Sequence, residues 1–387
     1  MVAISRNRTA LALGIVTLAL ACASATPSDP DPIATHAGPD DARAPFIGDA
    51  ALGSGDDGGA EEDAAPEPDA GPPPMVMPAF LVGYDEAWFG TKFGTDLTTD
   101  WDPKYVAATL DGIVAAGGHV VRIFLFELMQ GVTLGASQPQ TQSVSPAMLA
   151  NVASVLDMAR ARGLWVYLTA LEGNQSSKVP WLKTYYANLA TNTAGEGAAF
   201  ETHVLGPLLA VLDQHKDNVF GLDLVNELDA PTTDGVWSDP VGGPRAFVQR
   251  TRAFVRSKSP WLKVTATVGW DNAPLLLANG FLSGLGLDFY DLHVYSDSGT
   301  YSGATGVCNR AQQDGVPVYL GEFGQKSHTY DDNLQKTAAA QFLWTAKSMC
   351  FKGALAWRYD TAESWWSYVL PDGGLRPAAA VVRLFGM

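Results

Sequence analysis

Residues 221–227 read Gly-Leu-Asp-Leu-Val-Asn-Glu, and residues 318–324 read Val-Tyr-Leu-Gly-Glu-Phe-Gly. Each stretch is a short apolar run that leads into a glutamate. Near-continuous apolar runs of this length are typical of parallel strands that are covered on both faces. Further runs of the same kind precede, separate and follow these two, with longer amphipathic segments between them. The sequence therefore predicts an α/β fold with a parallel sheet.

The number and spacing of the runs indicate a (β/α)8 barrel (TIM barrel) over residues 80–387. Eight strand-like runs lie at residues 80–84, 119–126, 164–171, 219–227, 262–270, 289–295, 317–322 and 353–359. Helical segments are expected at residues 146–162, 198–215, 245–257 and 333–349. A doubly wound open sheet is the alternative. No Gly-x-Gly-x-x-Gly motif follows the first strand, where a dinucleotide-binding fold would carry one.

The N-terminus has the pattern of an export signal, predicted here to span residues 1–22. Arg6 and Arg8 precede an apolar run at residues 10–21, and small residues follow it. That run is shorter than the roughly 20 residues needed to span a bilayer. Cys22 directly follows Ala-Leu-Ala and resembles the lipid-modified cysteine of bacterial lipoproteins. We therefore expect an exported lipoprotein of the outer membrane or cell surface, with plain secretion and an incidental Cys22 as the alternative.

Residues 23–79 are predicted to form a disordered acidic linker rich in Pro, Gly and Ala. They contain twelve acidic residues and a single arginine, and hold most of the net charge of −16. Such a segment has little apolar surface to bury. The acidity of the chain argues against nucleic acid as a partner, because phosphate contacts need a Lys/Arg surface. We expect a monomer that binds a polysaccharide or oligosaccharide.

Polar side chains gather where the predicted strands end, which is the catalytic face of a (β/α)8 barrel. In chain order, these strand-end residues are Asp85 and Glu86, Arg122 and Glu127, Glu172 and Asn174, Asn226 and Glu227, Trp270, His293 and Tyr295, Glu322, and Trp357 and Tyr359.

Two of these carboxylates, Glu227 and Glu322, are the candidate catalytic residues. They end the fourth and seventh strands, so their side chains can converge over the mouth of the barrel. Glycoside cleavage requires such a pair, since one carboxyl group protonates the leaving oxygen while the other attacks or activates water.

These motifs resemble clan A glycoside hydrolases, and most of all the cellulase-type glycoside hydrolase family 5. The resemblance rests on Asn226-Glu227, on Leu-Gly-Glu-Phe-Gly at residues 320–324, on His-Val-Tyr at residues 293–295, and on Arg122 and Trp357. The chain departs from the family pattern at two places. Leu228 follows the Asn-Glu pair where the family usually has Pro, and the third strand ends in Glu172 where the family usually has His.

The resemblance implies a double-displacement mechanism that retains the anomeric configuration. Glu322 would be the nucleophile and Glu227 the general acid/base, with their carboxyl groups about 5–5.5 Å apart. An ionised Glu322 needs positive or hydrogen-bonding neighbours, for which Arg122 and the Tyr295 hydroxyl are the candidates.

The remaining candidate residues are expected to bind substrate. Asn226 would hydrogen-bond the sugar 2-hydroxyl, and His293 would position hydroxyls or the acid/base. Trp357 would form a stacking floor under the sugar, while Trp270 and Trp237 would line further subsites.

The expected activity is hydrolysis of a β-linked, β-1,4 polysaccharide such as mannan or glucan. The alternatives are an exo-acting or transglycosylating clan A β-glycosidase on short oligosaccharides, and a non-catalytic carbohydrate-binding barrel. We expect no cofactor and no metal, because the six histidines show no ligand spacing. Cys308 and Cys350 are expected at opposite ends of the barrel wall, and therefore unpaired. Residues 131–145 and 174–197 are expected to be long loops.

Overall fold

A computed structural model describes residues 74–387 except residues 91–92, 177, 234, 238, 240, 270–271, 328 and 362–364. The predicted signal at residues 1–22, with Cys22, lies outside the described residues. So do residues 23–73 of the predicted linker, and Trp270. Within the described ranges, no helix is long and apolar enough to cross a bilayer.

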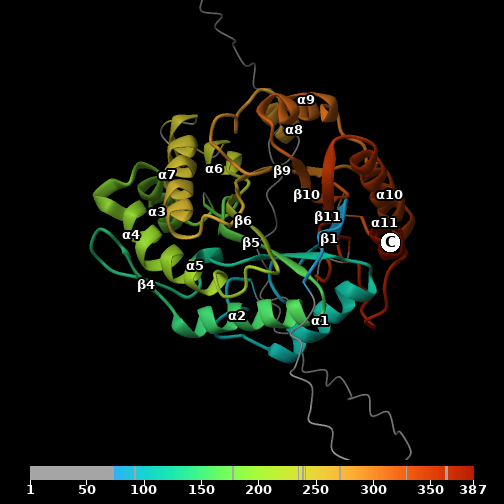
Figure 1. The fold of residues 1–387 in the computed structure, drawn as a ribbon, viewed down its shortest axis with the longest axis horizontal. Coiled ribbons are helices and arrows are strands. Elements are labelled where there is room, and N and C mark those ends of the chain that lie inside the picture. Colours follow the sequence, from blue (N-terminus) through green and yellow to red (C-terminus); the bar gives the residue numbers. More distant parts are fainter. Residues whose placement is uncertain are drawn as a thin grey trace, which may run out of the picture. The chain divides into compact units, whose positions relative to one another are not determined.

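The core of the molecule is one parallel sheet that curls into a barrel, as the sequence predicts (Figure 1). Its spatial order is β7-β6-β5-β2-β1-β11-β10-β9-β8. The strands are β1 (Leu81–Asp85), β2 (Val120–Phe124), β5 (Trp165–Glu172), β6 (Val219–Asn226), β7 (Val264–Thr265), β8 (Thr267–Val268), β9 (Tyr290–Tyr295), β10 (Val318–Gly324) and β11 (Phe351–Ala356).

The barrel closes through its two shortest strands. β7 pairs with β6, and β8 pairs with β9, while Ala266 alone separates β7 from β8 along the chain. The single strand expected at residues 262–270 is therefore split into two halves, each of which holds one neighbour. This connection makes the sheet a (β/α)8 barrel and excludes the open doubly wound alternative.

Helices surround the barrel and cover its outer face (Figure 1). Several begin at sequence signals of a helix start, since Asp102 caps α1, Ser145 caps α2 and Asp331 caps α10. The helices are α1 (Pro103–Ala115), α2 (Pro146–Ala161), α3 (Pro180–Thr191), α4 (Glu196–Phe200), α5 (Gly206–Leu212), α6 (Asp229–Thr233), α7 (Gly242–Lys258), α8 (Ala273–Ala278), α9 (Ala304–Asp314), α10 (Asp332–Ser348) and α11 (Pro377–Gly386).

The helix expected at residues 198–215 is continuous but irregular. A π-helical turn, Glu201–Leu205, joins α4 to α5. Pro207 lies in the first turn of α5, and a proline has no N–H to donate to the preceding turn. The wider π-helical turn directly precedes the turn of α5 that contains this proline.

The two long loops expected from the sequence contain regular structure instead. Residues 131–145 hold an antiparallel hairpin formed by β3 (Val132–Leu134) and β4 (Thr141–Val144). Residues 174–197 hold α3, and short 3-10 turns lie at Glu127–Met129 and Thr193–Gly195. The prediction of extended loops is therefore wrong in both places.

The interior of the barrel is closed at the end where the strands begin. Phe220, Phe289 and Tyr319 pack together there with ring centroids 5.1–5.4 Å apart, and Tyr319 meets both phenylalanines edge to face. Leu81, Val120 and Leu355 complete this aromatic floor. Polar side chains occupy the interior above the floor, so the two ends of the barrel differ in chemistry.

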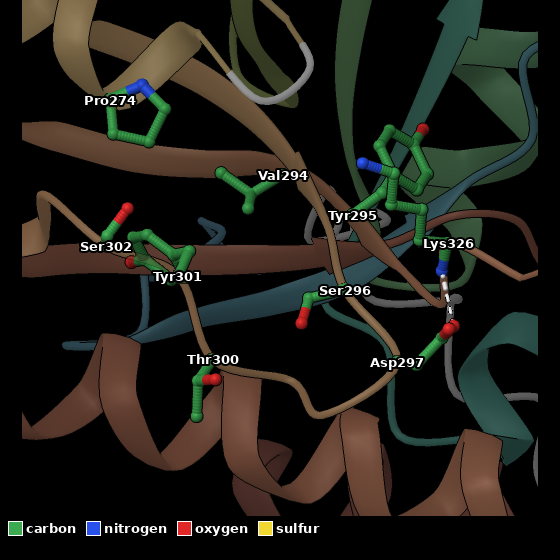
Figure 2. Close-up of a pocket in the computed structure, with 9 residues that line it drawn as sticks. All are labelled: Pro274, Val294, Tyr295, Ser296, Asp297, Thr300, Tyr301, Ser302 and Lys326. Carbon is green, nitrogen blue, oxygen red and sulfur yellow. Dashed lines mark hydrogen bonds between the residues drawn. The ribbon is translucent and has the colours of Figure 1, made fainter.

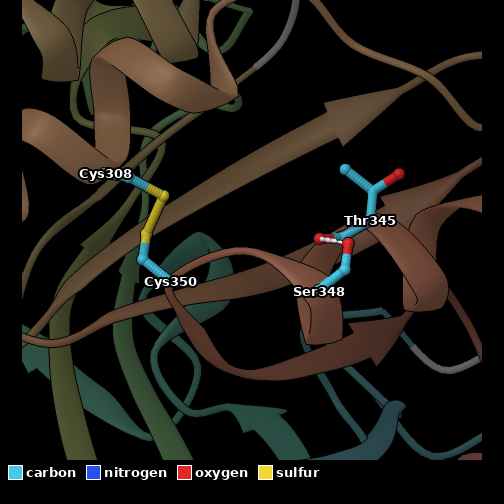
Figure 3. Close-up of a disulfide and its surroundings, with 4 residues drawn as sticks. All are labelled: Cys308, Thr345, Ser348 and Cys350. Atoms are coloured by element: carbon cyan, nitrogen blue, oxygen red, sulfur yellow. Dashed lines mark hydrogen bonds between the residues drawn. A yellow bond between two sulfur atoms is a disulfide. The ribbon is translucent and has the colours of Figure 1, made fainter.

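Cys308 and Cys350 form a disulfide, so the prediction that they are unpaired is wrong (Figure 3). Their Cα atoms are 5.6 Å apart. α9 is only 11 residues long, so Cys308, its fifth residue, lies near its middle rather than near the start of a full-length helix. It thereby comes level with Cys350, in the turn between α10 and β11.

The disulfide closes a loop of 42 residues in sequence separation, and such a link restricts the unfolded chain. Replacing both Cys308 and Cys350 by Ser should lower the free energy of unfolding by about 2–4 kcal/mol. Denaturant unfolding of the purified, oxidised protein measures the change. Cys22→Ser is the matched control and should leave the barrel's stability unchanged. Two titratable thiols at Cys308 and Cys350 in the unfolded, unreduced protein would contradict the bridge.

Candidate active site

The carboxyl ends of β2, β5, β6, β9 and β10 bring the predicted site residues together above the barrel. Glu227 directly follows β6, and Glu322 lies within β10. Both side chains are buried at the mouth, with exposed fractions of 2%. Residues 95 positions apart along the chain therefore meet in one site because their strands point the same way.

Arg122, on β2, is the charged centre below this mouth and is fully buried. Its Nη1 donates to Asp85 Oδ1 at 3.1 Å and to Glu322 Oε1 at 2.5 Å. Its Nη2 donates to Asp223 Oδ2 and to Asn226 Oδ1, both at 2.9 Å. One guanidinium on β2 thus fixes four side chains from three other strands, β1, β6 and β10.

One cation among several buried carboxyl groups leaves a surplus of negative charge. Burial raises the pKa of Asp223 to about 6 and that of Asp291 to about 7, and in both cases the charge of Arg122 opposes the shift. Burial also raises the pKa of Asp85, with the charge of Glu322 adding to the effect. These groups hold protons more tightly than they would in water.

Glu322 is surrounded by groups that favour its carboxylate form. Burial, with the charge of Glu227 adding to it, raises the pKa of Glu322 above its usual value, and His293, the charge of Arg122 and a hydrogen bond from the Tyr295 hydroxyl oppose that rise. Tyr295 ends β9, so the neighbouring strand supplies this donor. The structure thus places on Glu322 the two neighbours that the sequence analysis named.

Glu227 is held by its backbone as well as by its side chain. Its φ is +49°, a conformation that costs a non-glycine residue about 1–3 kcal/mol. Its N–H donates to Thr267 Oγ1 at 2.7 Å, in the short strand β8. Gly269 gives the carboxyl group its room, because a Cβ at that position would lie 2.3 Å from Glu227 Cδ.

His293 lies between the two glutamates. Its Nδ1 is 3.2 Å from Glu227 Oε1 and 3.3 Å from Glu322 Oε1. Burial lowers the pKa of His293 to about 3, so the ring is neutral at ordinary pH. A neutral ring protonated at Nδ1 can donate to either carboxylate without adding charge.

The ligating atoms of Glu227, His293 and Glu322 all lie within 4.8 Å of one another. In the described part of the chain, these are the side chains placed closely enough to hold a metal ion. The Arg122 guanidinium, whose Nη1 lies 2.5 Å from Glu322 Oε1, opposes a cation there by charge repulsion.

The end of β5 contributes two further polar residues, Glu172 within the strand and Asn174 in the turn that follows it. Asn174 Nδ2 donates to Glu227 Oε2, and its backbone N–H donates to Glu172 Oε1 at 2.6 Å. Glu172 Oε2 accepts from Asn226 Nδ2 at 2.9 Å. Burial raises the pKa of Glu172 well above its usual range, and the charge of Glu227 adds to this shift.

Aromatic rings line one side of the mouth around Trp357, which directly follows β11 and is half-buried. Its ring lies 6.1 Å from Trp88, 6.1 Å from Phe124 and 6.4 Å from Trp366, between centroids. The guanidinium of Arg358 covers the face of Trp88 at 4.2 Å. These rings form an apolar wall beside the carboxylates.

Trp237 does not join this wall. It is buried against Phe247 of α7 and shares a small cavity with Leu171 and Val225, which places it in the layer between the barrel and its helices. The prediction that Trp237 lines a substrate subsite is therefore corrected to a packing role. Trp270 lies outside the described residues, so its predicted role stays a prediction.

A pocket of about 300 Å³ adjoins the site behind Tyr295 (Figure 2). Hydroxyl-bearing side chains from the loop after β9 line much of it. The loop is tied to the segment after β10, since Asp297 Oδ1 accepts from the backbone N–H groups of Lys326 and Ser327. The lining residues are Pro274, Val294, Tyr295, Ser296, Asp297, Thr300, Tyr301, Ser302 and Lys326.

Solved structures with this architecture were found by comparison, whereas no protein-family model and no curated protein matches the sequence. An exo-β-1,4-mannosidase from Opitutaceae bacterium strain TAV5 is 18% identical with a TM-score of 0.61, over 79% of this chain and 59% of that one. A variant of GH5_18 from Streptomyces cattleya, in complex with Manβ1-4GlcNAc, is 18% identical with a TM-score of 0.62, over 79% of each chain. An endo-1,4-β-mannanase from Eisenia fetida is 18% identical with a TM-score of 0.55, over 78% of this chain and 95% of that one. The chain has the fold of these three proteins, one of which is a member of GH5_18.

Several residues of the site were not selected from the sequence. Asp223 and Asp291 are charged residues inside otherwise apolar strands, and that interruption was the available signal. Glu172 and Asn174 stood at a strand end but were not chosen as site residues. Thr267 gave no signal, because its contact with Glu227 depends on how the barrel closes.

The raised pKa of Asp291 predicts a pH-dependent stability. A carboxyl group whose pKa is about 7 when folded and near 4 when unfolded keeps its proton only in the folded state between those values. The stability it contributes is complete below about pH 4 and is lost as the pH rises through 7. Asp291→Asn should remove a slope of up to about 1.4 kcal/mol per pH unit. Denaturant unfolding between pH 5 and 8 measures it.

The exposed variant Asp217→Asn is the control for this prediction, because its carboxylate lies at the surface beside Arg160. Its stability should follow that of the wild type across the pH range. Equal slopes for Asp291→Asn and the wild type would contradict the assignment of a retained proton to Asp291.

Proposed function

We propose that this chain is a retaining β-glycosidase that cleaves β-1,4-linked mannosides. The observation that carries the proposal is the closeness of the two glutamates, since one carboxylate oxygen of Glu227 and one of Glu322 lie within 4.8 Å of each other. Retaining enzymes need carboxyl groups about 5–5.5 Å apart, whereas inverting enzymes need about 6.5–9.5 Å to admit a water.

In the first step, Glu322 acts as the nucleophile. Its carboxylate forms a bond to the anomeric carbon while the bond from that carbon to the leaving oxygen breaks. Arg122 and Tyr295 hold Glu322 in place and favour its ionised form. The oxygen that attacks is thereby presented in a fixed position, which reduces the entropy cost of the reaction.

Glu227 supplies the proton. It gives its proton to the leaving oxygen as that bond breaks, and then takes one from the water that hydrolyses the glycosyl-enzyme. His293 touches both glutamates and stays neutral, so it can follow the change of charge by redirecting one hydrogen bond.

The proposed sugar rests on the structural neighbours and on the shape of the mouth. Structures with this fold include an exo-β-1,4-mannosidase and an endo-1,4-β-mannanase, and another holds Manβ1-4GlcNAc. Trp357 offers an apolar plane for the C–H face of a sugar ring. Asn226 is oriented by Arg122 and lies where it can meet the 2-hydroxyl next to Glu322. The pocket behind Tyr295 gives room for a further unit.

Removing either glutamate should abolish most of the activity. Glu322→Ala and Glu227→Ala are each expected to lower kcat/KM on β-mannan by at least about 100-fold, the lower range for a positioned acid or base. Added azide should partly restore Glu227→Ala on an activated aryl glycoside, because azide can attack the glycosyl-enzyme without a general base. Asp217→Asn is the surface control.

Product analysis tests the stereochemistry and the substrate together. Nuclear magnetic resonance of the first product should show the β-anomer, and sizing of products from mannan, cellulose, mixed-linkage glucan and xylan should show mannan as the preferred polymer. Mixed oligomers indicate endo action, while monosaccharide alone indicates exo action. An α-anomer first, or full activity in either alanine variant, would refute the mechanism.

We also propose that the chain acts outside the cytoplasm as a lipoprotein attached through Cys22. The disulfide between Cys308 and Cys350 supports export, because such bonds persist in oxidising compartments. A lipid on Cys22 followed by the acidic linker would hold the barrel away from a membrane surface.

Cys22→Ser tests the attachment. The variant should move from the membrane fraction to the soluble fraction and should lose incorporation of labelled palmitate. Its activity on soluble substrate should equal that of the wild type. Membrane association that persists in Cys22→Ser would contradict the lipid anchor.

A further inference from the structure

A chain of hydrogen bonds links the two glutamates around the rim of the barrel. It runs from Glu322 to Arg122, on to Asn226, then to Glu172, and through Asn174 to Glu227. The last three hydrogen bonds involve the end of β5, the turn that follows β5, and the end of β6. None of them depends on His293, so Glu227 is held from two sides.

Glu172 is the centre of this half of the rim. One of its oxygens accepts from the Asn174 backbone, and the other accepts from the Asn226 side chain. Its own backbone carbonyl accepts from the Tyr186 hydroxyl at 3.0 Å, which fixes the end of β5 against α3. The carboxyl group therefore sets the position of two asparagines that lie on either side of it.

The partners of Glu172 are unusual for a buried carboxyl group. In the described part of the chain it forms no salt bridge, and both oxygens accept from amide donors. Burial raises the pKa of Glu172 well above its usual range, although the charge of Arg122 opposes the rise, and burying so polar a group costs free energy that its hydrogen bonds must offset. A group kept at that cost, next to a proposed acid/base, is better explained by positioning than by stabilisation.

Asn174 makes the direct contact with Glu227. Its side-chain amide donates to Glu227 Oε2, while His293 contacts the other oxygen, Oε1. With both oxygens held, the carboxyl group cannot rotate freely. The oxygen that carries the proton is thereby kept in one orientation toward the glycosidic oxygen.

We propose that Asn174, fixed in place by Glu172, is a positioning residue that orients the Glu227 carboxyl group for proton transfer to the leaving oxygen. This inference rests on the proposed role of Glu227 as acid/base. It gives a role to Glu172, which ends β5 at the position where glycoside hydrolase family 5 usually has a histidine. It also explains why the turn after β5 lies against the end of β6, where a Cβ on Gly173 would meet the Asn226 carbonyl at 2.3 Å.

The test uses the dependence of the rate on the leaving group. A sugar alcohol is a poor leaving group and needs protonation, whereas dinitrophenolate leaves without it. The full chain carrying Asn174→Ala should lose about 10- to 100-fold in kcat/KM on β-1,4-mannotetraose, part of the roughly 10²–10⁴ that a positioned acid contributes. Its kcat/KM on dinitrophenyl β-mannoside or β-mannobioside, whichever the wild type hydrolyses, should change less than about threefold.

Three companion variants make the result decisive. Gln175→Ala, on the same turn, should leave both substrates unaffected. Glu172→Ala should also lower kcat/KM on β-1,4-mannotetraose but not on the dinitrophenyl substrate. Asn174→Ser replaces Asn174→Ala in the test if Asn174→Ala does not fold. An equal loss on both substrates, or no loss on either, would overturn the positioning role of Asn174.

Glu227→Ala separates failure of this inference from failure of the proposed function. If Glu227→Ala shows the selective loss in kcat/KM and Asn174→Ala does not, only the positioning role is wrong. If Glu227→Ala lowers kcat/KM equally on both substrates, Glu227 is not the acid, and the positioning role falls with it.

Discussion

The structure depends on one buried guanidinium. Arg122 binds side chains from β1, β6 and β10, and without it their carboxyl groups would face one another in a low-dielectric interior. The ion pairs repay the cost of burying the arginine only because nearly every donor finds an acceptor. The same contacts set the position of Glu322 and the orientation of Asn226. The Arg122 side chain therefore contributes both to the stability of the fold and to the arrangement of the site.

The closure of the barrel matters to the site in a second way. β8 is only two residues long, yet Thr267 in it receives the backbone N–H of Glu227. Closing the ring thus also holds Glu227 in its left-handed conformation. Gly269, which follows β8, leaves the space into which the carboxyl group turns.

Much of this arrangement could be predicted from the sequence, because strand positions follow from apolar runs and catalytic ends follow from strand direction. In this way the sequence predicts that Glu227, Glu322, Arg122, His293 and Tyr295 come together, and the structure brings them into contact. The predictions that were wrong, for the two cysteines and for Trp237, concern distances between elements, which no local sequence pattern encodes. Whether Cys308 lies next to Cys350 depends on the length of α9. Whether Trp237 packs against α7 depends on the direction of the loop that carries it. α3 could have been found, since Pro180 is followed by buried Leu182, Tyr185, Tyr186 and Leu189 at helical spacing.

The floor of Phe220, Phe289 and Tyr319 has a consequence for molecular traffic. The barrel is therefore open at one end only. A ligand that reaches Glu227 and Glu322 must enter and leave through that same opening. A long polymer cannot be threaded through such a chamber. If the proposed activity holds for a polymer, that polymer would have to lie across the open end of the barrel, and a second cleavage would require it to shift along that end or to dissociate.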